Sequence, residues 1–314
     1  MTTASDQVVA PAAAWACDMT VLRNEGGVLP LDPSATVALI GRHSVETFAM
    51  GGDPVQAHLG ERLTLADGLG PARHEASRET VEAIDDAVRA AALADVTVIL
   101  VGPEEEAADE RALHLPGTQN ALVDAVAGAA RHTVVVVRAA TPVFMPWRDR
   151  VDAVLWTGPP GPGAGHDVAA ALLGTVEPAG RLTTTFPADD GRHPPRPFPA
   201  ARAHLDGRKP EPAYWLGHGL GYGRWEYADA RVIGGDSPGV GVTVTNVGDR
   251  ESREVVQVYH QPADRDEPVR LTGWAAVTVA PGESARVMVA TDARDGELLI
   301  ARGLGDIRAS LPLD

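Results

Sequence analysis

The chain has 314 residues, 44% of them hydrophobic, and its 43 acidic against 27 basic side chains give a formal net charge of −16. This length and apolar content are enough for about two domains, each with its own core. The negative charge disfavours nucleic acid and anionic membrane surfaces as partners. A single cysteine, Cys17, excludes an internal disulfide and a cysteine-based metal site.

The amino-terminal residues show no targeting pattern. Residues 2–16 lack the basic start and long apolar core of a secretory signal. No segment of the chain reaches the ~18 consecutive apolar residues that cross a bilayer as a helix. We therefore expect a cytoplasmic protein. The ten histidines are scattered without a paired spacing typical of zinc, so we expect no metal.

Short apolar runs alternate with helical patterns through the first 175 residues. Strands are predicted at residues 36–41, 96–102, 132–140 and 151–158, and helices at 77–95, 118–130 and 163–174. The apolar runs are continuous rather than alternating, as burial on both faces of a sheet requires. We predict an α/β domain with a mainly parallel sheet sandwiched by helices.

The pattern changes after residue 187. Residues 188–213 are rich in Pro and Arg and have no hydrophobic period, which indicates a linker. From about residue 225 apolar and polar residues alternate in short segments separated by turns, which is typical of a small all-β sandwich. The predicted domains are 1–190 for the α/β domain, 191–224 for the linker and 225–314 for the sandwich.

The most informative stretch is VGPEEEAADERALHLPG at residues 101–117. It follows an apolar strand and places five acidic residues before a helix, namely Glu104, Glu105, Glu106, Asp109 and Glu110. Ligands of open α/β sheets bind at the carboxyl ends of strands. A carboxyl group placed there can be tuned into a proton donor. A solvated acidic loop is the alternative that composition alone supports.

Several blocks resemble family 3 glycoside hydrolases, the β-glucosidase family. MTVLRNEGGVLPLD (19–32) resembles the opening of that family's second domain, and EPAGRLTTTFP (177–187) and GHGLGYG (217–223) are the most specific blocks. Residues 231–314, including PVRLTGWAAVTVAPGES (268–284), look like the family's fibronectin type III-like domain. The resemblance implies a carboxyl-terminal α/β domain, a fibronectin type III-like sandwich and a chemistry without cofactors.

In that family a (β/α)8 barrel precedes these blocks and supplies the nucleophilic Asp and most of the groups that hold the sugar. About 20 residues precede the first matching block here, which is too few for eight strand–helix units. No segment resembles the family's nucleophile motif. The resemblance therefore implies that the attacking carboxylate belongs to another chain.

The resemblance assigns the general acid/base to Glu106, by counting back from the Leu-Pro-Gly at 115–117. The loop departs from the family pattern, because Ala107 and Ala108 replace a Gly and an aromatic residue and Glu110 replaces an Arg. Retaining hydrolysis also needs a second carboxyl group about 5–5.5 Å away. Glu106 is thus the candidate acid/base.

Three further residues complete the predicted site. Glu104 is the second candidate for the acid/base. Asp109 and Trp215 are candidates for substrate binding, the latter because an aromatic ring beside GHGLGYG can stack on a sugar. Packing of Trp215 between the two domains is the alternative.

Three hypotheses remain open on the sequence. The first is a β-glucosidase component that contributes the acid/base loop, cleaves β-linked glycosides with a barrel chain and is inactive alone. The alternative is a non-catalytic binding or assembly subunit that uses the vacant barrel-docking face; a truncated gene product is a third reading. Because exposed apolar faces usually mark interfaces, we expect a barrel-domain partner or a homo-oligomer.

Overall fold

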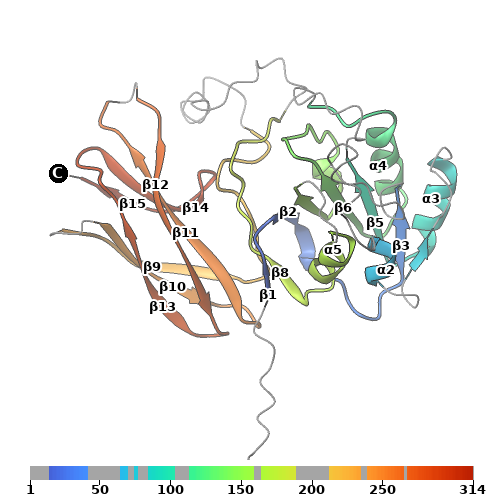
Figure 1. The fold of residues 1–314 in the computed structure, drawn as a ribbon, viewed down its shortest axis with the longest axis horizontal. Helices are drawn as coiled ribbons and strands as arrows, with labels where there is room; N and C mark the ends of the chain where they lie inside the picture. The colour runs from blue at the N-terminus through green and yellow to red at the C-terminus, as the bar shows by residue number, and fades with distance from the viewer. Residues whose placement is uncertain are drawn as a thin grey trace, which may run out of the picture.

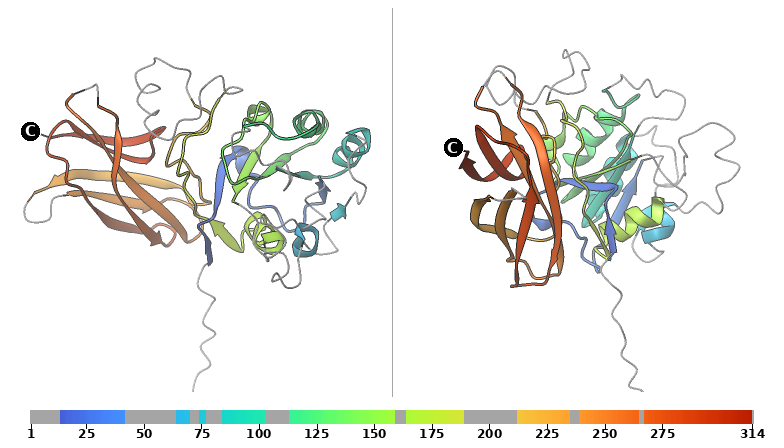
Figure 2. Two further views of the ribbon diagram at one scale, coloured as in Figure 1. Left: turned by 45° about the horizontal axis from the view of Figure 1, so that its top comes forward. Right: turned by 60° about the vertical axis from the view of Figure 1, so that its left-hand side comes forward.

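The computed structural model describes residues 14–41, 64–69, 74–76, 84–102, 113–158, 164–188, 212–234, 239–264 and 267–313. These residues form an α/β domain and a β-sandwich, which lie side by side (Figure 1). Views from two further directions show the segment that follows the α/β domain running between them (Figure 2). In the described ranges no helix has the length and apolarity to cross a bilayer.

The α/β domain is built on a six-stranded sheet in the order β2-β7-β6-β5-β3-β4. Its strands are β2 (Met19–Asn24), β3 (Val37–Ile40), β4 (His74–Ala76), β5 (Val96–Val101), β6 (Thr133–Arg138) and β7 (Ala153–Thr157). All neighbouring strands are parallel except β2, which pairs antiparallel with β7. The prediction of a mainly parallel sheet is confirmed.

Helices cover both faces of this sheet, as predicted. They are α2 (Leu65–Leu69), α3 (Ile84–Leu93), α4 (Gln119–Ala127) and α5 (Ala164–Leu172). In β5, Ile99 and Val101 pack with α3 and α4, whereas Val98 and Leu100 pack with α2 and α5. Because successive side chains of a strand point to opposite faces, a strand covered on both sides must be apolar throughout. The described residues of this domain also form two short 3-10 helices, Glu25–Gly27 and Arg148–Arg150.

The second domain is a sandwich of two antiparallel sheets with orders β13-β10-β9 and β12-β11-β14-β15. Its strands are β9 (Trp225–Ile233), β10 (Gly239–Asn246), β11 (Ser252–Gln261), β12 (Arg270–Val279), β13 (Ser284–Ala290), β14 (Glu297–Gly303) and β15 (Asp306–Pro312). Valines of β10, β11 and β13 meet Leu298 and Ile300 of β14 in its core. The predicted antiparallel sandwich is present.

Sequence patterns missed several strands. They include β2, β9, β14 and a short parallel ribbon of β1 (Ala14–Ala16) with β8 (Val176–Pro178). The edge strand β9 is mostly exposed and carries charged residues on its open side, so its apolar pattern is weak. Central β14 holds the unbroken run Leu298–Ala301 between β11 and β15 and therefore lacks alternation.

Residues 212–224, which fall in the predicted linker, are held between the two domains. On one side the Leu220 amide donates to the Val21 carbonyl oxygen of β2 at 2.8 Å, and the ring of His218 bonds the Leu22 carbonyl oxygen at 2.8 Å. On the other side the Leu304 amide donates to the Leu216 carbonyl oxygen at 3.1 Å. This part of the chain is therefore an ordered junction segment.

A buried charge cluster joins the same two domains. Glu254 of β11 has no exposed side-chain surface and lies 3.0 Å from Arg181 Nη2 and 2.8 Å from Arg302 Nε. Arg181 also donates to the carbonyl oxygen of Gly180 at 3.0 Å. Because Arg181 follows the α/β domain and Glu254 belongs to the sandwich, this contact fixes the domains to each other.

Candidate functional site

The carboxyl ends of β3 and β5 form the site to which the sheet topology points. From β3 the chain moves outward to β4, whereas β5, β6 and β7 continue in the opposite direction from the other side of β3. Loops that leave two adjacent strands in opposite directions open a crevice, and open α/β sheets bind ligands there. The acidic loop follows β5, so it departs from one of the two strands at this switch point.

The structure fixes both ends of the acidic loop. At its start Gln119, the first residue of α4, accepts a hydrogen bond from the Gly102 amide at 2.9 Å and donates to the Gly102 carbonyl oxygen at 2.9 Å. At its end the Phe144 amide donates to the Leu113 carbonyl oxygen at 2.6 Å. The His114 ring then meets the Phe144 ring edge to face, 5.9 Å between centroids. The two described ends of the loop are therefore each fixed to a neighbouring part of the α/β domain.

Glycines end both strands of the switch point for a steric reason. A Cβ on Gly102 would overlap the carbonyl oxygen of Arg138, and one on Gly41 would overlap the carbonyl oxygen of Leu100. Gly41 also has φ +104°, which side chains rarely adopt. The neighbouring strand thus approaches the backbone closely where each loop begins.

Arg138 lies beside Gly102, where the acidic loop begins. It ends β6 and is half-buried. Burial lowers the pKa of its guanidinium from the usual value.

Glu104, Glu106 and Asp109 lie outside the described residues, so their side chains are not placed. Trp215 is described and lies in the junction segment, where it packs beside a cluster that includes Leu216, Tyr259 and Leu304. The junction segment contacts β2, and β7 and β6 lie between β2 and β5 in the sheet. At a strand spacing of about 4.8 Å this amounts to about 14 Å across the sheet. Trp215 is thus placed between the domains and not beside the anchors of the acidic loop.

Sequence reasoning missed Gln119 and Arg138. The only available signal was position, because each lies immediately beside the carboxyl end of a predicted strand or the start of a predicted helix. The described residues contain no group of three or more His, Cys, Asp or Glu arranged to hold a metal ion.

Comparison with models of protein families shows to which family the chain is related. Residues 19–222 match the model of the glycosyl hydrolase family 3 C-terminal domain. The chain belongs to glycoside hydrolase family 3. The matched range takes in the six-stranded sheet, both anchors of the acidic loop and residues 212–222 of the junction segment.

Full-length relatives in family 3 are longer than this chain. Thermostable beta-glucosidase B of Acetivibrio thermocellus is 32% identical over 316 residues, covering 88% of this chain and 42% of the relative. A beta-glucosidase of Rhizobium radiobacter is 35% identical over 285 residues, covering 74% of this chain and 34% of the relative. The chain therefore spans less than half the length of these family members.

Solved structures agree with the fold. DesR, a beta-glucosidase from Streptomyces venezuelae crystallised with D-glucose, is 29% identical and covers 74% of this chain with a TM-score of 0.65; the match spans 35% of DesR. The family 3 beta-glucosidase of Bifidobacterium adolescentis covers 94% of this chain at 24% identity and a TM-score of 0.78, over 52% of its own length. Both the α/β domain and the sandwich thus have counterparts in a solved family 3 structure.

Proposed function

We propose that this chain contributes the acid/base loop to a retaining β-glucosidase site whose nucleophile lies on a separate barrel chain. The proposed substrate is a β-linked glycoside, and Glu106 is the proposed acid/base with Glu104 as the second candidate. The observation that supports the proposal most is the place of the loop. It is anchored at the switch point of a family 3 α/β domain, between Gly102 and Leu113.

In this proposal Glu106 protonates the oxygen of the departing group while a carboxylate of the barrel attacks the anomeric carbon. Glu106 then removes a proton from the water that releases the sugar. A proton donor needs a raised pKa, which apolar surroundings or a neighbouring carboxylate provide. Docking of the barrel over the loop would remove water from it, and Glu104 and Glu105 would add repulsion.

The test measures hydrolysis by the chain mixed with a family 3 barrel domain. Glu106→Gln is expected to lower kcat/KM for an alkyl β-glucoside by about 10²–10⁴-fold, because its leaving group needs protonation. Dinitrophenyl β-glucoside has a leaving group that departs without a proton. The same variant should form the glycosyl-enzyme from it at nearly the normal rate.

Glu104→Gln and Glu105→Gln are the matched controls, since each removes one charge from the same loop. Both should keep most of the activity on the alkyl glucoside. A large loss in Glu104→Gln with normal turnover in Glu106→Gln would move the role to Glu104. Unchanged turnover in all three variants would exclude this loop from the chemistry.

A non-catalytic role is the alternative, and the replacement of the family's Gly-aromatic-Asp-Arg run by Ala107, Ala108, Asp109 and Glu110 favours it. In that case the chain binds a barrel chain or a second copy of itself through the docking face. Binding of a barrel domain without any gain in hydrolysis would support this alternative.

The remaining features of the proposal concern the sandwich and the setting. We propose a fibronectin type III-like assignment for residues 225–314, supported by seven antiparallel strands in two sheets. We also propose that the chain acts in the cytoplasm, with Asp109 contacting substrate at the loop. Trp215 would contact the substrate only if the barrel positions the sugar next to the junction segment.

A further inference from the structure

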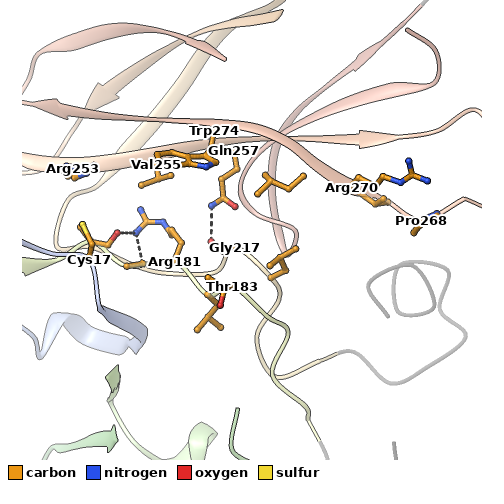
Figure 3. A pocket seen from close by; sticks show the side chains of 16 residues that line it. Cys17, Arg181, Thr183, Gly217, Arg253, Val255, Gln257, Pro268, Arg270 and Trp274 are labelled. Carbon is orange, nitrogen blue, oxygen red and sulfur yellow. Dashed lines mark hydrogen bonds between the residues drawn. The ribbon is translucent and has the colours of Figure 1, made fainter. Parts of the chain in front are cut away.

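A groove of about 750 Å³ lies between the two domains, and neither Gly102 nor Leu113, the described ends of the acidic loop, lines it. Its floor and one wall come from Cys17, residues 179–183 and the junction segment, and its other wall comes from β11, β12 and the turn that precedes β12 (Figure 3). Cavities of roughly 300–1,000 Å³ are typical of small-molecule sites. The groove therefore has the size for a ligand and is built by both domains.

The sandwich wall offers an aromatic surface. Trp274 and Leu271 of β12 line the groove and are 61% and 41% exposed. Trp274 pairs with Gln257 of β11, whose amide donates to the Gly217 carbonyl oxygen at 2.9 Å. β11 is thus covered by the junction segment, whereas the edge strand β12 leaves its indole uncovered. An exposed indole beside apolar walls suits an aromatic ring.

The groove is basic, although the chain as a whole is acidic. Among the described residues its lining includes Arg181, Arg253 and Arg270 and no carboxylate, in a chain with 43 acidic residues. Arg181 is paired with the buried Glu254, and the exposed Arg270 lies 3.2 Å from Glu267. The positive charge of the described lining therefore favours an anionic ligand.

Arg253 differs from the other two arginines. In the described part of the chain no carboxylate pairs with its guanidinium, and its Nε is buried without a hydrogen-bond partner. A buried polar atom without a partner is costly, and a guanidinium is suited to binding a carboxylate through two parallel hydrogen bonds. Arg253 lies at the same end of the groove as Cys17, and Trp274 lies between it and Arg270 (Figure 3).

We propose that this groove binds a small aromatic carboxylate, with its ring against Trp274 and its carboxylate on Arg253. The proposal follows from three features that the described residues bring together in one cavity: an exposed indole, a guanidinium without a carboxylate partner and a lining without carboxylates. It is independent of the hydrolysis proposed above, since Gly102 and Leu113, the described ends of the acidic loop, do not line the groove.

Calorimetric titration with naphthoate and its neutral amide, naphthamide, tests the charge preference. Naphthoate should bind with a Kd below about 1 mM and about tenfold more tightly than naphthamide, because only the acid pairs with Arg253. Arg253→Gln should remove this preference, and Trp274→Ala should weaken both ligands. Arg286→Gln and Met288→Ala, exposed positions of β13 outside the groove, are controls that should leave both affinities unchanged.

Cys17 provides a second readout, because it is the only cysteine of the chain, is exposed and lines the groove. Its thiolate attacks the disulfide of dithiobis(nitrobenzoate), forms a mixed disulfide and releases nitrothiobenzoate. For each reagent, the rate with Cys17 is divided by the rate with glutathione. This ratio should be at least about fivefold higher for the anionic reagent than for neutral dithiodipyridine. Naphthoate should slow the reaction, and Arg253→Gln should abolish the preference.

Three results would overturn the proposal. One is equal binding of naphthoate and naphthamide, and another is no binding of naphthoate at about 1 mM. The third is a concentration-dependent dimer that Trp274→Ala dissociates, without naphthoate binding, which would assign the groove to a second copy of the chain.

Discussion

At the scale of single residues, Glu254 explains how the two domains are held in one arrangement. It lies between Arg181 and Arg302 with no exposed side-chain surface. A buried carboxylate needs such partners, because the loss of its hydration is costly. The cluster carries more positive than negative charge, which also leaves the adjoining groove basic.

Glu254→Gln is predicted to destabilise the chain by about 3–5 kcal/mol, because two nearly buried guanidinium groups lose their counter-charge. Urea denaturation monitored by circular dichroism measures this change. Glu226→Gln, an exposed position of β9, is the control and should change stability by less than about 0.5 kcal/mol. A loss below about 1 kcal/mol in Glu254→Gln would contradict the role given to this cluster.

Glu177 gives a prediction for pH. Burial raises the pKa of its carboxyl group above the usual 4.5, although hydrogen bonds from Ser252 and the Tyr222 amide oppose the rise. The folded chain therefore holds the proton more tightly than the unfolded chain. The stabilisation from Glu177 is full below pH 4.5 and is lost as the pH rises through the raised pKa.

The measurement compares the free energies of unfolding of the wild type and Glu177→Gln between pH 4 and about 7. The wild type should lose stability relative to the variant as the pH rises. Ser252→Ala removes a donor that favours the charged form, so it should make this loss larger. A difference that stays flat or grows in favour of the wild type with rising pH would refute the assignment.

At the scale of elements, the junction segment depends on one glycine. Gly217 has φ +79°, and a Cβ on it would overlap Gln257 Oε1 and the Tyr259 hydroxyl oxygen of β11. Gly282, in the turn before β13, has φ +75° and nothing within 4 Å of such a Cβ. A comparison of substitutions at Gly217 and Gly282 therefore distinguishes the cost of backbone strain from the cost of a steric clash between the domains.

Gly282→Ala should destabilise the chain by about 1–2 kcal/mol through its left-handed backbone alone. Gly217→Ala should cost at least about 2 kcal/mol more, because Gln257 and Tyr259 must also move. Thermal unfolding of both variants measures the difference. Equal losses would show that the junction tolerates a side chain at this position.

Burial on both faces explains which elements the sequence predicted. β5 and β6 were clear because each is a nearly continuous apolar run, and α3 because its apolar residues recur at helical spacing. β9 and β14 were missed, one because it is exposed and the other because it is central. The position of the acidic loop followed from local sequence. Its anchors, Gln119 and Phe144, depend on which segments meet in space, and no local pattern encodes that.

At the scale of the whole molecule, the described fold comprises a family 3 α/β domain and a β-sandwich. The family 3 α/β domain presents its switch point and the two ends of an acidic loop. Retaining hydrolysis needs a second carboxyl group about 5–5.5 Å from the acid/base. In the proposal that group comes from a barrel, so assembly is required for activity.

The most direct test measures nitrophenyl β-glucoside hydrolysis by purified residues 1–314, alone and with a family 3 barrel domain supplied as a separate chain. We predict negligible turnover from the chain alone and turnover that appears when the barrel is added and that saturates with its concentration. A robust rate from the chain alone, lost in Glu106→Gln, would contradict the account, because both carboxyl groups would then belong to this polypeptide.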